Sequence, residues 1–185
     1  MSFTEIDPLF LLPDEVWERV SPVIPADRPK PKGGRPRMEN RQALNAIFYV
    51  LRTGCQWNAI PRSLGASSTV HDCFSEWVQA GVFERLWEEG LNQYADEVGI
   101  EGEWNAMDGA MVKAPLGGKV TGRNPTDRGK SGTKRSLLTD GNGIPIAIVI
   151  ESANRHDMKL TEATLAAQRI VPEDYPEGEP RNLSI

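Results

Sequence analysis

Cysteine is scarce in this 185-residue sequence, and the scarcity excludes some kinds of site. The two cysteines, Cys55 and Cys73, form no Cys-x-x-Cys pair. A cysteine-based zinc cluster is therefore not expected. Two isolated cysteines in an ordinary composition are typical of reduced, buried thiols in a cytosolic protein.

Long apolar runs are also missing, and we expect no secretory leader. The N-terminus carries Glu5, Asp7 and Pro8 within its first residues, and no later stretch is long and apolar enough to cross a bilayer. The glycines between Gly117 and Gly132 do not follow the spacing of a P-loop, which disfavours nucleoside-triphosphate hydrolysis. We expect a cytoplasmic protein with no membrane partner.

Positive charge is in deficit overall, with a formal net charge of −5, yet it is concentrated in two segments. Residues 28–37 hold five cations and no acid, and residues 113–135 hold seven cations against the single acid Asp127. The net charge alone argues against a nucleic-acid partner. Because charge distribution matters more than the sum, the two basic segments favour DNA binding.

Residues 13–99 have the pattern of a helical domain, preceded by a flexible arm at 1–12. Helices are expected from Pro13 to about Pro22, from Asn40 to Gly54, from Ser67 or Ser68 to Gly81, and from Val82 to Val98. A side-chain cap at Asn40, another at Ser67 or Ser68, and a glycine stop at Gly54 are expected to set these ends. A buried stripe is predicted at Val70, Cys73, Phe74, Trp77 and Val78.

Two parts of this domain allow more than one interpretation. The basic linker 26–38 reads either as a solvated tether or as an arm that contacts DNA phosphates. The short turn at 62–65 followed by a Ser-capped helix outlines a helix-turn-helix. The outward face of that second helix is neutral to acidic, so base readout and simple packing both stay open. That face comprises Thr69, His71, Asp72, Ser75, Glu76 and Gln79.

After Glu103 the hydrophobic pattern changes to that of strands. Strands are expected at 104–112, 134–139 and 145–151, and the turn Asp140-Gly141-Asn142-Gly143 predicts an antiparallel hairpin. The apolar run IPIAIVI is typical of a strand buried on both faces. A helix capped by Asp157 follows to about residue 170, and the polar, Pro-rich tail 171–185 is expected to be disordered. The predicted fold class is α+β.

Two groups of motifs resemble bacterial insertion-sequence transposases of the DDE type. DEVWERVSPVIP, GGRPR and NAIFYVLRTGCQWNAIPRSLG are similar to the helical N-terminal domain of these enzymes. MDGAMVKAPLGG, NPTDRGKSGTKR, LLTDGNGIPIAIVI and ANRHDMKL are similar to the opening of their RNase H-like catalytic domain. Together the motifs cover residues 14 to about 165.

The resemblance implies binding to transposon terminal inverted repeats and metal-dependent phosphodiester chemistry in a nucleoid-associated bacterial protein. In the family two Asp and one Glu hold Mg²⁺ ions, which activate water and then a 3′-hydroxyl. Asp108 matches the first Asp, so it is the candidate catalytic and metal-binding residue. The candidate DNA-binding residues are Lys30, Lys32, Arg35, Arg37, Arg41, Arg62, Lys113, Lys119, Arg123, Arg128, Lys130, Lys134 and Arg135.

The family's second Asp and its Glu have no counterpart among these 185 residues. We expect residues 103–170 to be the N-terminal part of a truncated catalytic domain, with Mg²⁺ bound weakly or not at all. Asp157 and Glu162 are open to two readings: metal ligands, or a helix cap and a surface acid. Without the family's fourth strand, the edge of 106–112 is expected to be unpaired.

Three functions are consistent with this pattern. The first is a transposase, or the N-terminal fragment of one, that assembles as a homo-oligomer or with full-length transposase. The second is a non-catalytic DNA-binding protein or transposition repressor derived from a transposase. The third is a helical protein-interaction domain that does not bind DNA at low salt.

Overall fold

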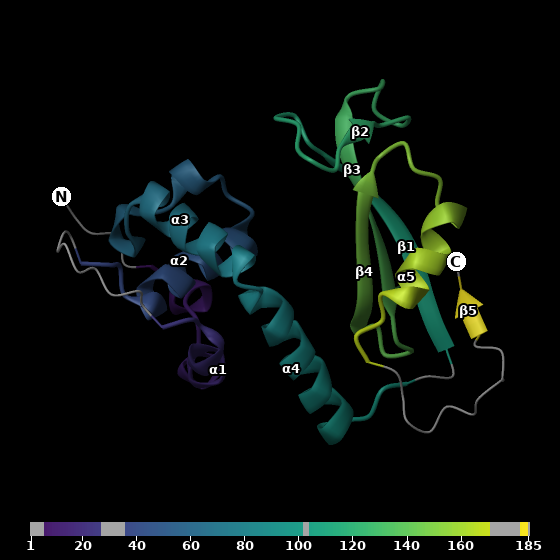
Figure 1. Cartoon of the computed structure of the whole chain (residues 1–185). Coiled ribbons are helices and arrows are strands. Elements are labelled where there is room, and N and C mark those ends of the chain that lie inside the picture. Colours follow the sequence, from purple (N-terminus) through teal and green to yellow (C-terminus); the bar gives the residue numbers. More distant parts are fainter. Residues whose placement is uncertain (1–5, 27–35, 102–103, 171–181, 185) are drawn as a thin grey trace. The chain divides into compact units, whose positions relative to one another are not determined.

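The computed structural model describes residues 6–26, 36–101, 104–170 and 182–184 (Figure 1). The chain forms two compact units, Met1–Trp87 and Glu88–Ile185. The first is helical, and the second combines the remainder of a helix that begins in the first unit, residues 88–97, with a sheet and one further helix, as the predicted α+β class requires. Among the described residues, no helix has the length and apolarity needed to cross a membrane.

The helical unit contains three complete helices and the start of a fourth. These are α1 (Asp14–Val20), α2 (Asn40–Thr53), α3 (Ser67–Gln79) and α4 (Val82–Glu97), with 3-10 turns η1 (Pro8–Phe10), η2 (Ser21–Val23), η3 (Trp57–Ala59) and η4 (Arg62–Leu64). Asp14 and Glu15 lie in the first turn of α1, where their charge complements the helix dipole. Gly54 ends α2 at φ +66°, a left-handed conformation that glycine adopts without steric cost.

The side-chain caps expected for α2 and α3 are wrong. Asn40 is the first residue of α2 and Ser67 the first residue of α3, and neither helix has a side-chain hydrogen bond at its cap. The Ser67 hydroxyl instead lies 3.5 Å from the Asn58 side-chain oxygen. A polar side chain near the start of a helix can therefore contact a residue outside the helix and leave the helix without a side-chain cap.

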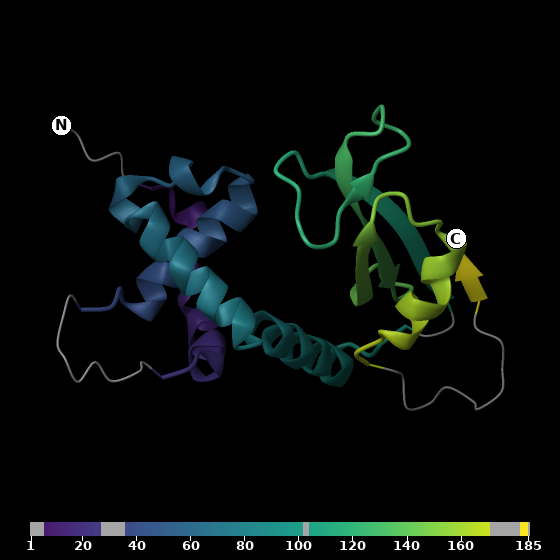
Figure 2. The same ribbon diagram turned by 45° about the horizontal axis from the view of Figure 1, so that its top comes forward.

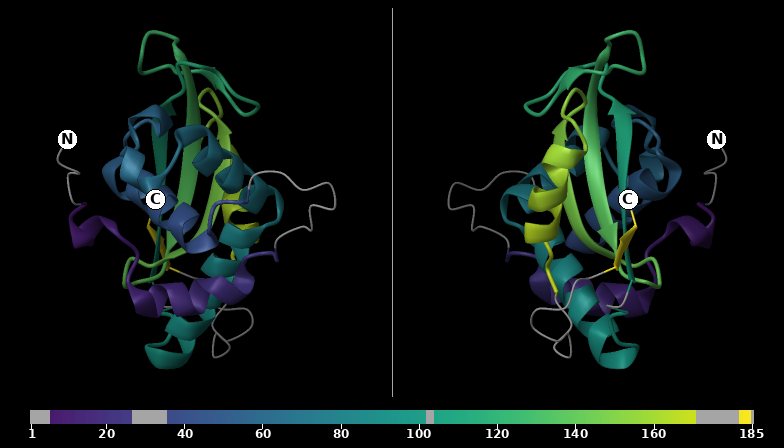
Figure 3. Two further views of the ribbon diagram at one scale, coloured as in Figure 1. Left: turned by 90° about the vertical axis from the view of Figure 1, so that its left-hand side faces the viewer. Right: turned by 90° about the vertical axis from the view of Figure 1, so that its right-hand side faces the viewer.

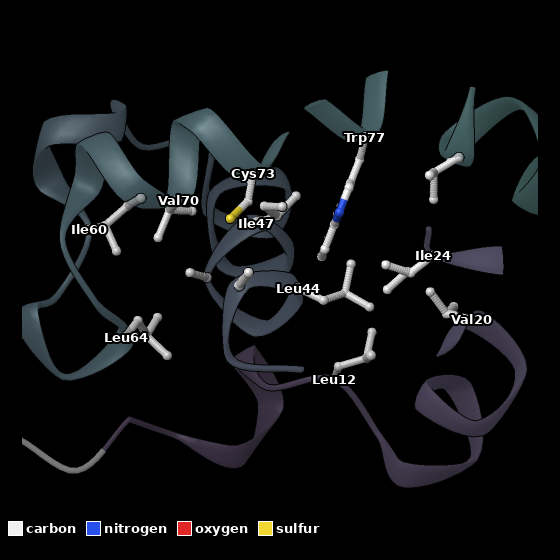
Figure 4. Packing of buried hydrophobic residues seen from close by; sticks show 13 residues of the cluster. Leu12, Val20, Ile24, Leu44, Ile47, Ile60, Leu64, Val70, Cys73 and Trp77 are labelled. Atoms are coloured by element: carbon white, nitrogen blue, oxygen red, sulfur yellow. The ribbon is translucent and has the colours of Figure 1, made fainter. Parts of the chain in front are cut away.

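The core of the helical unit is a continuous apolar cluster centred on α2 and α3 (Figure 4). Trp77 and Ile47 are at most 1% exposed, and Leu12 is 8% exposed. The flexible arm expected over 1–12 therefore does not extend to Leu12. Val78 is 51% exposed, so the predicted stripe ends one residue earlier. Both cysteines are reduced thiols; Cys73 is buried as predicted, but Cys55 is only half-buried.

The described residues of the second unit include a five-stranded sheet. Its strands are β1 (Trp104–Lys113), β2 (Gly122–Arg123), β3 (Ser131–Thr139), β4 (Pro145–Ser152) and β5 (Asn182–Ser184). β3 pairs antiparallel with β1 on one side and with β2 and β4 on the other. The three predicted antiparallel strands are confirmed. The short strands β2 and β5 were not predicted from the sequence.

Asp140 fixes the predicted hairpin between β3 and β4. Its carboxylate is buried and accepts backbone hydrogen bonds from Asn142 at 3.0 Å and Ile144 at 2.8 Å. A short acidic side chain that satisfies the turn's own amides stabilises this turn. The hairpin is confirmed.

The two faces of the sheet differ in what covers them. The helix α5 (Met158–Ala166) packs on one face, where the Thr164 hydroxyl donates to the Ser136 hydroxyl at 2.8 Å. We call this the covered face; Figure 2 shows α5 against the strands. Strand alternation assigns the other, open face to Ala106, Asp108, Ala110, Val112, Thr133, Arg135, Leu137, Ile148 and Ile150. Ile148 is 38% and Ile150 58% exposed, so burial of this run on both faces was a wrong prediction.

The outer edge of β1 is partly occupied. β5 runs parallel to β1 and pairs residues 182–184 with residues 104–106 (Figure 3). Residues 182–184 thus form a strand where a disordered tail was expected, while 171–181 and 185 lie outside the described residues. In the part of the chain that the structure describes, residues 107–113 have no strand partner on this side. The expected unpaired edge therefore holds for 107–112 and is wrong for 106.

Candidate active site and nucleic-acid interface

Asp108 lies in the middle of β1, directly opposite Leu137 on β3. Its neighbours Met107 and Asn105 point to the other side and are at most 7% exposed. The Asp108 carboxylate therefore points outward from the open face, and it forms no hydrogen bond or ion pair with the described residues. It is neither a turn cap nor buried in apolar packing, which leaves it accessible to a ligand.

Arg135 is the predicted cation that lies nearest to Asp108 along the sheet. It pairs with Ala110, so it is diagonal to Asp108 on the same face. Diagonal cross-strand neighbours are about 7–8 Å apart, within reach of a long side chain. One acid and one exposed cation thus share the open face, surrounded by small and apolar side chains.

Lys134 was predicted to contact DNA, and this prediction is wrong. Its side chain is 6% exposed on the covered face. The ammonium group donates to the Arg155 carbonyl at 2.9 Å and to the Asp157 carboxylate at 3.0 Å. Since both partners belong to the turn before α5, Lys134 ties that turn to β3 and is inaccessible to phosphate.

Asp157 neither caps a helix nor lies beside Asp108 as a second metal ligand would. It occupies the position before α5 but makes no side-chain cap hydrogen bond. Its carboxylate lies against β1 at Gly109, where a Cβ would come within 2.6 Å of Oδ1. This contact is on the face opposite Asp108, so strand alternation separates the two acids. Glu162 is exposed on α5 and is a surface acid.

Replacing Lys134 with alanine is expected to destabilise the sheet unit by about 2–3 kcal/mol. The change leaves the Arg155 carbonyl without its donor and removes a buried stem, although the 62% exposure of Asp157 limits the electrostatic loss. Lys159→Ala on the exposed side of α5 is the matched control, with an expected effect within about 0.5 kcal/mol. Hydrogen exchange of the β1 and β3 amides in urea measures both; equal protection in the two variants would contradict the assigned role.

Beyond the end of β1 the chain forms two hydrogen-bonded turns that flank β2. Asn124 organises the second of them: its side-chain oxygen accepts from the Thr126 amide at 2.9 Å and the Thr126 hydroxyl at 2.8 Å. The Lys130 amide donates to the Asp127 carbonyl at 3.0 Å. Arg128 and Gly129 both have positive φ, which is typical of a tight hairpin turn. The basic loop is therefore an ordered structure, and Arg128 stands at its tip.

We call the cations of this region the cationic end of the sheet: Lys113, Lys119, Arg123, Arg128 and Lys130. Asp127 approaches Lys113 at 3.4 Å and Lys130 at 4.0 Å. Lys119, Arg123 and Arg128 are exposed and have no acidic partner among the described residues. Because the one acid already faces two lysines, the region keeps a net positive charge that can attract phosphate.

Two of the predicted DNA-binding residues of the helical unit, Arg37 and Arg41, are already paired with acids. Arg37 donates to Glu76 at 2.6 Å, and Arg41 is ion-paired with Asp14 with its guanidinium 6.0 Å from the Trp17 ring centre. Arg62 is exposed on η4. Lys30, Lys32 and Arg35 lie outside the described residues.

The segment expected to form a helix-turn-helix begins with a single 3-10 turn. η4 has three residues, and Gly65-Ala66 joins it to α3. On α3, His71 and Asp72 are exposed, and Glu76 is held by Arg37. This face has little positive charge to offer a DNA backbone.

The described residues do not complete a metal site. Within them, no group of three or more His, Cys, Asp or Glu side chains is placed to share a metal ion. Mg²⁺ is held by carboxylates together with water and phosphate oxygens in octahedral geometry. Asp108 supplies one carboxylate, which is insufficient by itself.

Comparison with known proteins gives matches over both units. Residues 12–87 match the family described as "Putative transposase of IS4/5 family", and residues 103–175 match the family described as "Transposase DDE domain". The "Insertion element IS402 uncharacterized 16.2 kDa protein" of Burkholderia cepacia is 32% identical over 120 residues, covering 62% of this chain and 81% of that protein. "Uncharacterized protein y4sN" of Sinorhizobium fredii is 30% identical over 103 residues, covering 56% and 76%.

A third relative matches over a shorter stretch. The "Putative transposase for insertion sequence element IS402" of Burkholderia cepacia is 47% identical over 38 residues, covering 20% of this chain and 18% of that protein. No solved structure matches.

Proposed function

The chain belongs to the IS4/5 family of transposases, and from this premise we propose that it binds the terminal inverted repeats of its own insertion element. The observation that carries the proposal is the cationic end of the sheet, which follows directly on the strand that bears Asp108. Three of its cations have no acidic partner among the described residues, and phosphate is the ligand that such a cluster attracts.

The open face supports a role for Asp108 next to bound DNA. The Asp108 carboxylate is exposed on β1 and shares the open face with Arg135 on β3. A duplex bound at the cationic end and extending over the open face would therefore lie next to both side chains. Transposases of this family generally use divalent metal. The described residues provide one carboxylate on the open face, Asp108, and no complete metal site. We therefore propose no cleavage step for this chain alone.

A second candidate is DNA binding without chemistry, as in a repressor that occupies the element ends or pairs with a complete transposase. The lack of further metal ligands near Asp108, among the residues the structure describes, favours this candidate. Both candidates require binding that weakens as salt rises. They differ in whether Mg²⁺ adds a reaction.

The test is to incubate the purified chain with the terminal repeats that flank its own gene, with and without Mg²⁺. We expect salt-sensitive binding, no cleavage product, and undiminished affinity in Asp108→Asn, since that change removes a negative charge facing DNA. Mg²⁺-dependent cleavage that disappears in Asp108→Asn would instead mean that the chain completes an active site. Failure to bind DNA at low salt would overturn the proposal and favour a protein-interaction role.

A further inference from the structure

Leu116 lies fully in solvent in the loop between β1 and β2. It is 100% exposed, more than any other large hydrophobic residue that the structure describes, and Val120 in the same loop is 41% exposed. In Figure 1 the loops around β2 project beyond the end of the longer strands. Single apolar residues on a surface need no special explanation. The position of Leu116 does need one, because it lies in a hydrogen-bonded turn with exposed cations close to it along the chain.

The turn that carries Leu116 is preorganised. Its four residues are Ala114, Pro115, Leu116 and Gly117, and the Gly117 amide donates to the Ala114 carbonyl at 2.9 Å. Proline at the second position fixes the backbone for such a turn, and Gly117 follows at φ +73°.

Further hydrogen bonds anchor this loop to the sheet. The Ala114 amide donates to the Ser131 carbonyl at 2.9 Å. At the far end of the loop, the Thr121 hydroxyl donates to the Gly118 carbonyl at 3.1 Å. Leu116 is thus held at a corner and is not the tip of an unstructured loop.

The surroundings of Leu116 indicate its partner. Lys113, Lys119 and Arg123 lie within seven residues of it and are all exposed. The nearest acid along the loops, Asp127, already faces Lys113. An apolar protein partner would bury a contiguous apolar patch, whereas the exposed apolar residues of this loop, Leu116 and Val120, alternate along the chain with exposed cations. Cations that hold phosphates beside an apolar side chain that enters the base stack are the two features of DNA-kinking proteins.

We propose that Leu116 is a wedge that inserts between base steps of bound DNA, with the cationic end gripping the phosphates on either side. This inference rests on the proposed DNA-binding function and adds a distortion of the duplex to it. A wedge of this kind binds most tightly where the stack is already weakened, because less unstacking is then needed.

The test uses the full chain and two short duplexes of identical sequence, one of them with a single unpaired nucleotide at its centre and 2-aminopurine beside it. Wild type is expected to bind the bulged duplex about tenfold more tightly and to raise the 2-aminopurine fluorescence. Leu116→Ala should abolish most of this preference and the fluorescence change, while affinity for the intact duplex stays within about threefold. Leu116→Phe should retain both signals.

Met158→Ala is the matched control, since Met158 is 80% exposed on α5 and does not belong to the loop that carries Leu116. It should behave as wild type. Equal affinity of wild type for the two duplexes, or an equal loss on both in Leu116→Ala, would overturn the wedge and leave DNA binding intact. No binding to either duplex would overturn the proposed function as well. Self-association without DNA that Leu116→Ala abolishes would assign the residue to contact with a second copy and refute the wedge.

Discussion

Replacing Lys119 and Arg123 together with glutamine is expected to lower the affinity for terminal-repeat DNA about thirtyfold at ~0.1 M salt. Both side chains are exposed at the cationic end and have no acidic partner among the described residues. Each is therefore free to neutralise a phosphate. The loss of two such contacts should also reduce the slope of log affinity against log salt by about 2.

The control for this prediction removes the same charge elsewhere. Arg52 at the end of α2 and Lys159 on α5 are exposed, and their double replacement with glutamine changes the net charge equally. We expect this control to keep the wild-type salt slope and to lose less than about threefold in affinity. Fluorescence anisotropy over a salt series measures both quantities. If the two double variants lost affinity alike, net charge would explain the binding and the cationic end would have no special part in it.

The sequence predicts local structure well where one residue fixes the backbone by itself. Gly54 ends α2 because its left-handed conformation is intrinsic to glycine, and the Asp140 turn forms the hairpin because its side chain bonds to its own amides. The strand carrying Asp108 was likewise predictable from its period, as was the exposure of one edge of β1 over 107–112. These features depend on residues within a few positions of one another.

The errors lie where a distant residue decides the outcome. Lys134 is a lysine in a basic segment, and its burial depends on the Arg155 carbonyl and on Asp157, more than twenty positions away. The ion pair with Lys134 also explains why the Asp157 side chain does not cap α5. Likewise, IPIAIVI is apolar enough for burial on both faces, but α5 covers one face and nothing within the described part of the second unit covers Ile150 on the other.

Asn124 was missed, although the sequence carried a signal for it. An Asn-Pro-Thr run is typical of a turn in which the Asn side chain bonds to backbone two residues on, and the Thr126 amide makes that bond. Leu116 was missed for the opposite reason: a leucine between Pro and Gly gives no sign of whether it is covered. Its exposure is known only from the fold.

The largest expected loss of stability follows from Trp77→Ala, at about 3–5 kcal/mol in the helical unit. Trp77 is 1% exposed, and its side chain points from α3 toward Leu44 of α2, with Leu12 beyond it (Figure 4). Removing the indole leaves a cavity that the surrounding helices cannot fully close. Since small domains have a total stability of about 5–15 kcal/mol, the variant is expected to lose most of the hydrogen-exchange protection of α2.

Two further variants make this prediction specific to burial. Val78→Ala changes the next residue of α3, which is 51% exposed, and should cost less than about 0.5 kcal/mol. Trp77→Phe should cost less than about 2 kcal/mol. The ring volume is mostly kept, and the change removes an indole N–H that is buried without a hydrogen-bond partner among the described residues, a group whose burial costs about 1–3 kcal/mol. Equal loss of α2 protection in Trp77→Ala and Val78→Ala would contradict the placement of Trp77 at the centre of this core. If Trp77→Phe proved as damaging as Trp77→Ala, the N–H would have to be satisfied in solution, and its assigned cost would be wrong.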